Sequence, residues 1–91
     1  MRQTLNTIII DEIARIVQSK HNGTITGDWY YGMVYPIYRF YVGRIYIGGL
    51  LINNDIIIGD NVEDRAIVKI CDPDAIDVAV KVIEDIILQH V

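Results

Sequence analysis

The sequence contains only one cysteine, Cys71, so a single chain cannot form an internal disulfide. It has no apolar run near the roughly 20 residues that a membrane-spanning helix needs. No apolar stretch ending in a small-residue cleavage site follows the first residues, so we see no secretory signal. We therefore expect a soluble, cytoplasmic protein that does not bind a membrane.

Motifs for phosphate and zinc binding are also missing. The glycines at positions 43, 48 and 49 fit neither the dinucleotide fingerprint nor the Gly-Lys-Ser/Thr ending of a P-loop. No pair of cysteines is available for a zinc site. The acidic stretch 60–64 lacks the length and the closing glutamate of a calcium loop. We therefore expect no metal and no cofactor.

Catalytic constellations are absent as well. Cys71, His21 and His90 lie in no local motif that would pair a nucleophile with a base. Twelve carboxylates are present, but the sequence does not mark any pair as buried and facing. We therefore expect a protein that is not an enzyme.

The length and the apolar content of the chain suit a single domain. With 91 residues, 52% of them hydrophobic, it is long enough for one core and too short for two, which predicts one domain over residues 1–91. Nineteen isoleucines and six tyrosines favour strands and interfaces. The net charge of −4 argues against broad binding to a phosphate backbone.

The N-terminal segment has the pattern of an amphipathic helix. Thr4, Asn6 and Thr7 are each suitable N-caps, and Asn22-Gly23 is a suitable stop. At 100° per residue one face carries Ile9, Ile13, Ile16 and Val17. Asp11 and Glu12 come early and Lys20 comes late, which suits the helix dipole.

The C-terminal segment predicts a second helix. Asp72 is a natural N-cap and Pro73 suits the first helical position. A broad apolar stripe is formed by Ile76, Ala79, Val80, Ile83, Ile86 and Ile87. Val78, Val82 and Leu88 fall outside this stripe, which indicates a second contact surface.

Between the helices we expect four or five strands joined by short turns, which favours antiparallel pairing. The candidate strands are Thr24–Tyr31, Val34–Val42, Arg44–Ile52, Asp55–Ile58 and Arg65–Cys71. Gly48-Gly49 indicates a bulge or a close backbone approach in the third strand. The sequence therefore predicts an α+β fold, with an antiparallel sheet between an N-terminal and a C-terminal helix that both pack on one face.

Strand alternation leaves the second face of the sheet rich in tyrosine and isoleucine, which is typical of an interface. Our first hypothesis is a non-enzymatic protein-interaction module that acts as a homodimer, with a protein partner as a further option. The candidate interface residues are Tyr35, Ile37, Tyr41 and Tyr46, with Val78 and Val82 as a second set.

Two alternatives use the same residues or the charge pattern. Trp29, Arg39 and Arg44 supply aromatic and basic groups that could contact nucleic acid, although the net charge disfavours this. Residues 1–52 have a net charge of +2 and residues 53–91 one of −6. The acidic part could therefore act as an inhibitor that mimics a nucleic-acid backbone and blocks a basic partner.

Overall fold

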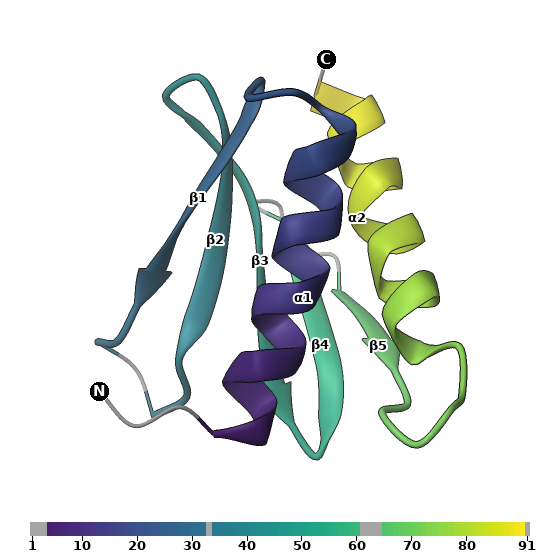
Figure 1. Cartoon of the computed structure of the whole chain (residues 1–91). Helices are drawn as coiled ribbons and strands as arrows, with labels where there is room; N and C mark the ends of the chain where they lie inside the picture. The colour runs from purple at the N-terminus through teal and green to yellow at the C-terminus, as the bar shows by residue number, and fades with distance from the viewer. Residues whose placement is uncertain (1–3, 33, 61–64, 91) are drawn as a thin grey trace.

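The computed structural model of the chain (Figure 1) describes residues 4–32, 34–60 and 65–90. Its elements are α1 (Leu5–Lys20), β1 (Ile25–Tyr30), β2 (Ile37–Val42), β3 (Ile45–Asn53), β4 (Asp55–Asp60), β5 (Arg65–Val68) and α2 (Ala75–His90). The five strands form one antiparallel sheet in the order β1-β2-β3-β4-β5. The predicted α+β fold, with an antiparallel sheet between two terminal helices, is confirmed.

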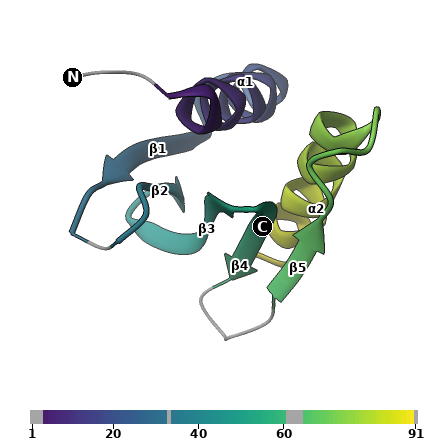
Figure 2. The same ribbon diagram turned by 90° about the horizontal axis from the view of Figure 1, so that it is seen from below.

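Both helices lie on the same face of the sheet. Seen from below, the sheet curves around them, with α1 on the β1 side and α2 beside β4 and β5 (Figure 2). The two helices pack side by side and run in the same direction (Figure 1). Every strand pairs only with its sequence neighbours, and all five strands contribute to the opposite face of the sheet.

Helix α1 begins where a threonine pair caps it. The Thr7 backbone N–H donates to Thr4 Oγ1 at 3.3 Å, and the Thr4 N–H donates to Thr7 Oγ1 at 2.9 Å. The last residue of the helix is Lys20 and its C-cap is His21. Asn22 and Gly23 follow with positive φ angles of 47° and 85°. The predicted dipole role of Asp11 is wrong, because a helix that begins at Leu5 has no acidic residue in its first turn.

Helix α2 begins later than predicted. Asp72 does not cap it, because Asp72 lies in a turn in which its N–H donates to the Lys69 carbonyl at 3.1 Å. The Asp72 carbonyl then accepts from Ala75, the first helical residue, at 3.1 Å. The chain needs this turn, which includes Pro73, to reverse direction after β5.

The largest differences from the predicted strand boundaries are at the start of β2 and the end of β5. Strand β2 starts at Ile37 instead of Val34, because Pro36 has no N–H to donate to a ladder. Strand β5 ends at Val68, three residues before Cys71. Tyr35 therefore lies in the loop between β1 and β2 and not in a strand.

A β-bulge interrupts β3, close to where the glycine pair predicted it. Phe40 pairs with Gly48 while its neighbour Tyr41 pairs with Tyr46, which leaves Ile47 as the extra residue. Ile47 is fully buried in the core. Residues 46 and 49 consequently share one face of the sheet.

The core lies between the helices and the face of the sheet that they cover. Isoleucine is the commonest residue among its buried members, and it packs well on a pleated surface. On α1 the buried stripe is rotated from the predicted one, since Ile10 and Ala14 are buried while Ile9 and Ile16 are only partly so. The buried side chains of the strands include Ile25, Phe40, Ile47, Leu50, Ile52, Ile56, Ile58 and Val68.

One polar contact joins the two helices. His21, at the end of α1, lies with Nε2 2.7 Å from Glu84 Oε2 on α2. Both side chains are less than one quarter exposed, and Glu84 Oε1 is buried without a hydrogen-bond partner.

We expect Thr4→Ala to lower the free energy of unfolding by about 1 kcal/mol, because it removes the oxygen that caps α1. Asn6→Ala is the matched control, since Asn6 is exposed and was an equally good cap candidate by sequence. Its cost should stay within about 0.5 kcal/mol. Urea unfolding followed by circular dichroism measures both, and equal costs would contradict the assigned cap.

Candidate functional site

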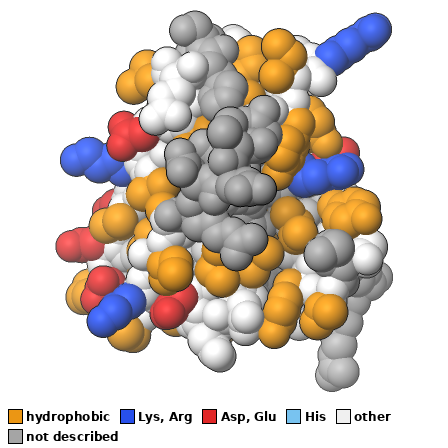
Figure 3. Space-filling model, turned by 180° about the vertical axis from the view of Figure 1, so that it is seen from behind, with side chains coloured by type: hydrophobic (Ala, Val, Ile, Leu, Met, Phe, Trp, Pro, Cys, Tyr) orange, Lys and Arg blue, Asp and Glu red, His pale blue; other side chains and the backbone are white. Residues whose placement is uncertain are grey.

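The face of the sheet turned away from the helices, called here the open face, carries a row of apolar side chains. Tyr30 pairs with Ile37, and Leu51 pairs with Ile57, which pairs with Ile67. Ile67 is 67% exposed. Figure 3 views the molecule from this side: apolar side chains are spread over the part of the face that belongs to described residues, and charged ones lie mostly towards its margins.

A second part of the open face is aromatic. The rings of Tyr41 and Tyr46, which are opposite each other on β2 and β3, lie 5.9 Å apart at 64°. The Tyr46 hydroxyl and Ile37 Cγ2 come within 3.0 and 3.1 Å of the position that a Cβ would take at Gly49. These side chains therefore converge over a glycine, and Ile37, Tyr41 and Tyr46 do share one surface as predicted.

The other predicted interface residues lie elsewhere. Tyr35 is 40% exposed in the loop between β1 and β2, and Val78 is 43% exposed on α2. Val82 packs partly against the core. Because α2 covers the opposite face of the sheet, the second set cannot join the first in one contact surface within a single chain.

The predicted nucleic-acid contacts are dispersed in the same way. Arg39 lies on the open face, where its Nε and one terminal nitrogen donate to the Asp28 carboxylate at 3.1 and 3.2 Å. Its guanidinium carbon also lies 4.7 Å from the centre of the Tyr30 ring. Trp29 contacts the core on the helix-covered side, and Arg44 lies in the exposed turn between β2 and β3.

The bond to Asp28 keeps the pKa of Arg39 above its usual value. This ion pair also uses the guanidinium N–H groups with which an arginine would bind a phosphate. The charge of Arg39 on the open face is therefore already neutralised within the chain.

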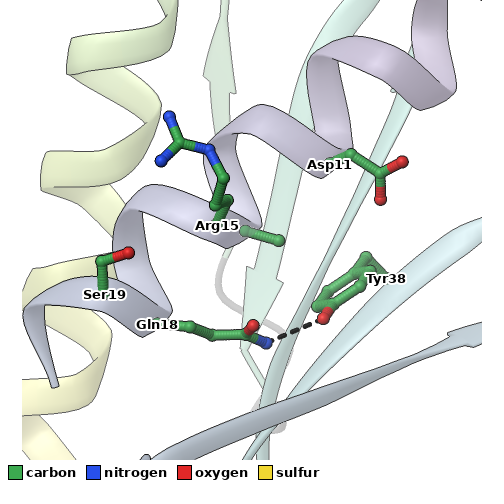
Figure 4. A pocket seen from close by; sticks show the side chains of 6 residues that line it. Asp11, Arg15, Gln18, Ser19 and Tyr38 are labelled. Atoms are coloured by element: carbon green, nitrogen blue, oxygen red, sulfur yellow. Dashed lines mark hydrogen bonds between the residues drawn. The ribbon is translucent and has the colours of Figure 1, made fainter. Parts of the chain in front are cut away.

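A second site lies on the other side of the sheet, where sequence reasoning placed no function. An open depression of about 550 Å³ separates α1 from β2 and is lined by Asp11, Ala14, Arg15, Gln18, Ser19 and Tyr38. In Figure 4, Gln18 and Tyr38 point toward each other, with Asp11 on the same side, while Arg15 points away. The Gln18 amide nitrogen donates to the Tyr38 hydroxyl at 2.7 Å.

Tyr38 reaches the depression because β1 has a glycine beneath it. A Cβ at Gly27 would lie 2.2 Å from a carbon of the Tyr38 ring, so the ring lies over β1 at that point. The ring of Trp29 packs edge-on against Tyr38 at 5.3 Å, and Tyr31 stacks on Trp29 at 5.9 Å. An isolated glycine in a predicted strand indicates such a close approach, and Gly27 is the signal that could have revealed this site.

The electrostatics of the depression keep the Tyr38 hydroxyl protonated. Burial, above all, raises the pKa of Tyr38, and the carboxylates of Asp11 and Asp28 add to this rise. The hydrogen bond from Gln18 acts in the opposite direction but does not outweigh burial. Tyr38 therefore offers an O–H donor throughout the physiological pH range.

Other chemistry is sparse in residues 4–32, 34–60 and 65–90. No group of three or more His, Cys, Asp or Glu side chains in these ranges could hold a metal ion. Cys71 is exposed in the turn before α2. Most of the acidic stretch 60–64 lies outside the described residues. Within the described residues, neither helix combines the length and the apolarity needed to cross a bilayer.

Comparison of the chain with protein-family models, with curated proteins and with solved structures finds no match in any of the three.

We expect Gly27→Ala to lower the free energy of unfolding by about 1–3 kcal/mol, because the new methyl group would displace the packed Tyr38 ring. In a Tyr38→Leu background the ring is gone, and the same substitution should cost less than about 1 kcal/mol. Urea unfolding of the four proteins in this cycle measures the difference. An equal cost in both backgrounds would show that the close approach is not what requires glycine.

Tyr38 should also make stability fall at alkaline pH. Its folded-state pKa is raised, so its contribution is fully present below about pH 10 and is lost as the pH rises through the folded-state value. The urea midpoint of the parent protein should therefore fall more between pH 8 and pH 11 than that of Tyr38→Phe. Tyr41→Phe should fall as much as the parent. An equal fall of the urea midpoint in all three proteins would contradict this role of Tyr38.

Proposed function

We propose that this protein is a non-enzymatic interaction module that works as a homodimer, with the open face as its contact surface. The observation that carries the proposal is the apolar row that crosses the five strands on the face that neither helix covers, from Tyr30 on β1 to Ile67 on β5. A contiguous apolar surface of this kind usually marks an interface.

The size of the open face suits a dimer of modest area. Strands about 4.8 Å apart and six residues long give a face of roughly 20 by 20 Å before side-chain relief is added. Specific interfaces begin at about 600 Å² of accessible surface for each partner, which a face of this size approaches once its side chains protrude. The contact would therefore be weak to moderate unless residues at the margin join it.

Charge supports a second copy as the partner. Arg39 and Asp28, on the open face, already form an ion pair within the chain. Two such faces can meet without placing like charges opposite each other, which would cost free energy. Tyr41 and Tyr46 add large side chains of the kind enriched at interfaces.

The exposed part of α2 supports a second, smaller contact. Val78 is 43% exposed on this helix, among the exposed carboxylates of Asp74, Asp77 and Asp85. We keep Val78 and Val82 as a secondary contact set for a protein partner. The same acidic surface is what favours the alternative of an inhibitor that blocks a basic partner.

Nucleic-acid binding is the less supported alternative, because Trp29, Arg39 and Arg44 lie on different surfaces.

We place the proposed dimer in the cytoplasm, where a reducing environment keeps an exposed thiol such as Cys71 free.

Sedimentation equilibrium at low micromolar concentration should give the mass of a dimer. Ile67→Asp should weaken association at least about tenfold, because it puts an unpaired charge in the apolar row. Ile45→Asp is the matched control, since Ile45 is also an exposed strand isoleucine, at 61%, but pairs with Val42 on the other face. A monomeric parent protein would overturn the proposal, as would equal weakening by the two variants.

A further inference from the structure

We propose that the depression between α1 and β2 binds a neutral, hydroxyl-bearing ring of the kind found in sugars. This site lies on the helix side of the sheet and is independent of the proposed dimer contact. Its volume of about 550 Å³ falls within the range of roughly 300–1,000 Å³ that is usual for small-molecule sites.

The hydrogen-bond donors and acceptors in the depression suit a ligand that carries hydroxyl groups. The Tyr38 oxygen accepts from Gln18, so its own hydrogen is left to donate. Asp11 projects from α1 two turns before Gln18 and on the same side (Figure 4). A carboxylate has about four acceptor positions, so Asp11 can take a ligand hydrogen besides its other contacts. A ligand with several hydroxyl groups can therefore accept from Tyr38 through one of them and donate to Asp11 through another.

The same groups disfavour charged ligands. An anion such as phosphate would meet the carboxylate of Asp11, while Arg15 is already bound to Glu12 and points away. An ammonium ion has no lone pair with which to accept the Tyr38 hydrogen. A hydroxyl group is both donor and acceptor, and so satisfies both sides of the site.

Aromatic side chains beside the depression suit the apolar faces of a sugar ring. Trp29 packs edge-on against Tyr38, and Tyr31, which is 49% exposed, stacks on Trp29. C–H groups of a pyranose can pack on such rings. Ala14, the smallest lining residue, leaves room between α1 and Tyr38.

Trp29 is the only tryptophan of the chain and lies next to Tyr38, so its fluorescence reports on the site. We would titrate the full chain with glucose, galactose, N-acetylglucosamine and maltose, and with inorganic phosphate and methylammonium for comparison. At least one sugar should give a saturable change. The Gln18 side-chain amide signals in an ¹H–¹⁵N spectrum should shift in the same titration.

Tyr38→Phe should weaken that sugar's binding about tenfold, the loss expected when one polar contact is removed. Gln18→Ala should weaken it as well, because Gln18 is the residue that fixes the position of the Tyr38 hydroxyl. Tyr41→Phe makes the same chemical change on the open face and should leave the affinity within about twofold. Circular dichroism shows which variants remain folded, and Gln18→Ala decides the test if Tyr38→Phe does not fold, because Gln18 lies on the flank of α1.

Three results would overturn the inference. One is the lack of a saturable response to any of the four sugars at up to about 100 mM, a concentration that would still detect the weakest specific sites. Another is a response to phosphate or methylammonium in place of sugar. The third is sugar binding that is weakened by Tyr41→Phe but not by Gln18→Ala.

Discussion

Five antiparallel strands in sequence order constrain the whole molecule, because each short connection reverses the chain. With an odd number of strands between them, α1 and α2 run in the same direction, and both lie on the same face of the sheet. Parallel neighbouring helices align their dipoles, which is mildly unfavourable, so packing must hold them together. The isoleucine-rich core and the contact between His21 and Glu84 provide that packing. Both terminal helices lie on one face of the sheet, and neither of them covers the other face.

Periodicity and turn residues were enough to predict this architecture. The helical stripes, the glycine and asparagine turns and the alternation along the strands gave the correct element order and the correct pairing direction. Errors occurred at boundaries where two local signals compete. Asp72-Pro73 has the form of a helix start, but the chain needs those residues to turn after β5. Pro36 lies in an apolar run that looks like a strand, yet it cannot join a ladder.

The candidate sites were harder to predict because alternation within one strand does not show where a residue lies in space. It correctly placed Ile37 and Tyr41 on one face, and their register with Tyr46 then followed from the turn. It could not show that Trp29 and Arg39 face opposite sides of the same sheet, since that depends on the pairing of β1 with β2. The contact between Gln18 and Tyr38 joins residues 20 positions apart, and no local pattern predicts it.

The bulge at Ile47 determines which side chains of β3 face outward. In a regular strand, positions 46 and 51 have opposite parity, so either the phenol of Tyr46 or the aliphatic chain of Leu51 could face outward, but not both. The additional residue resets the parity midway along β3, and both side chains come to the outside while Ile47 turns inward. A single inserted amino acid thus lets one strand contribute an aromatic group at one end of the outer surface and a hydrocarbon group at the other.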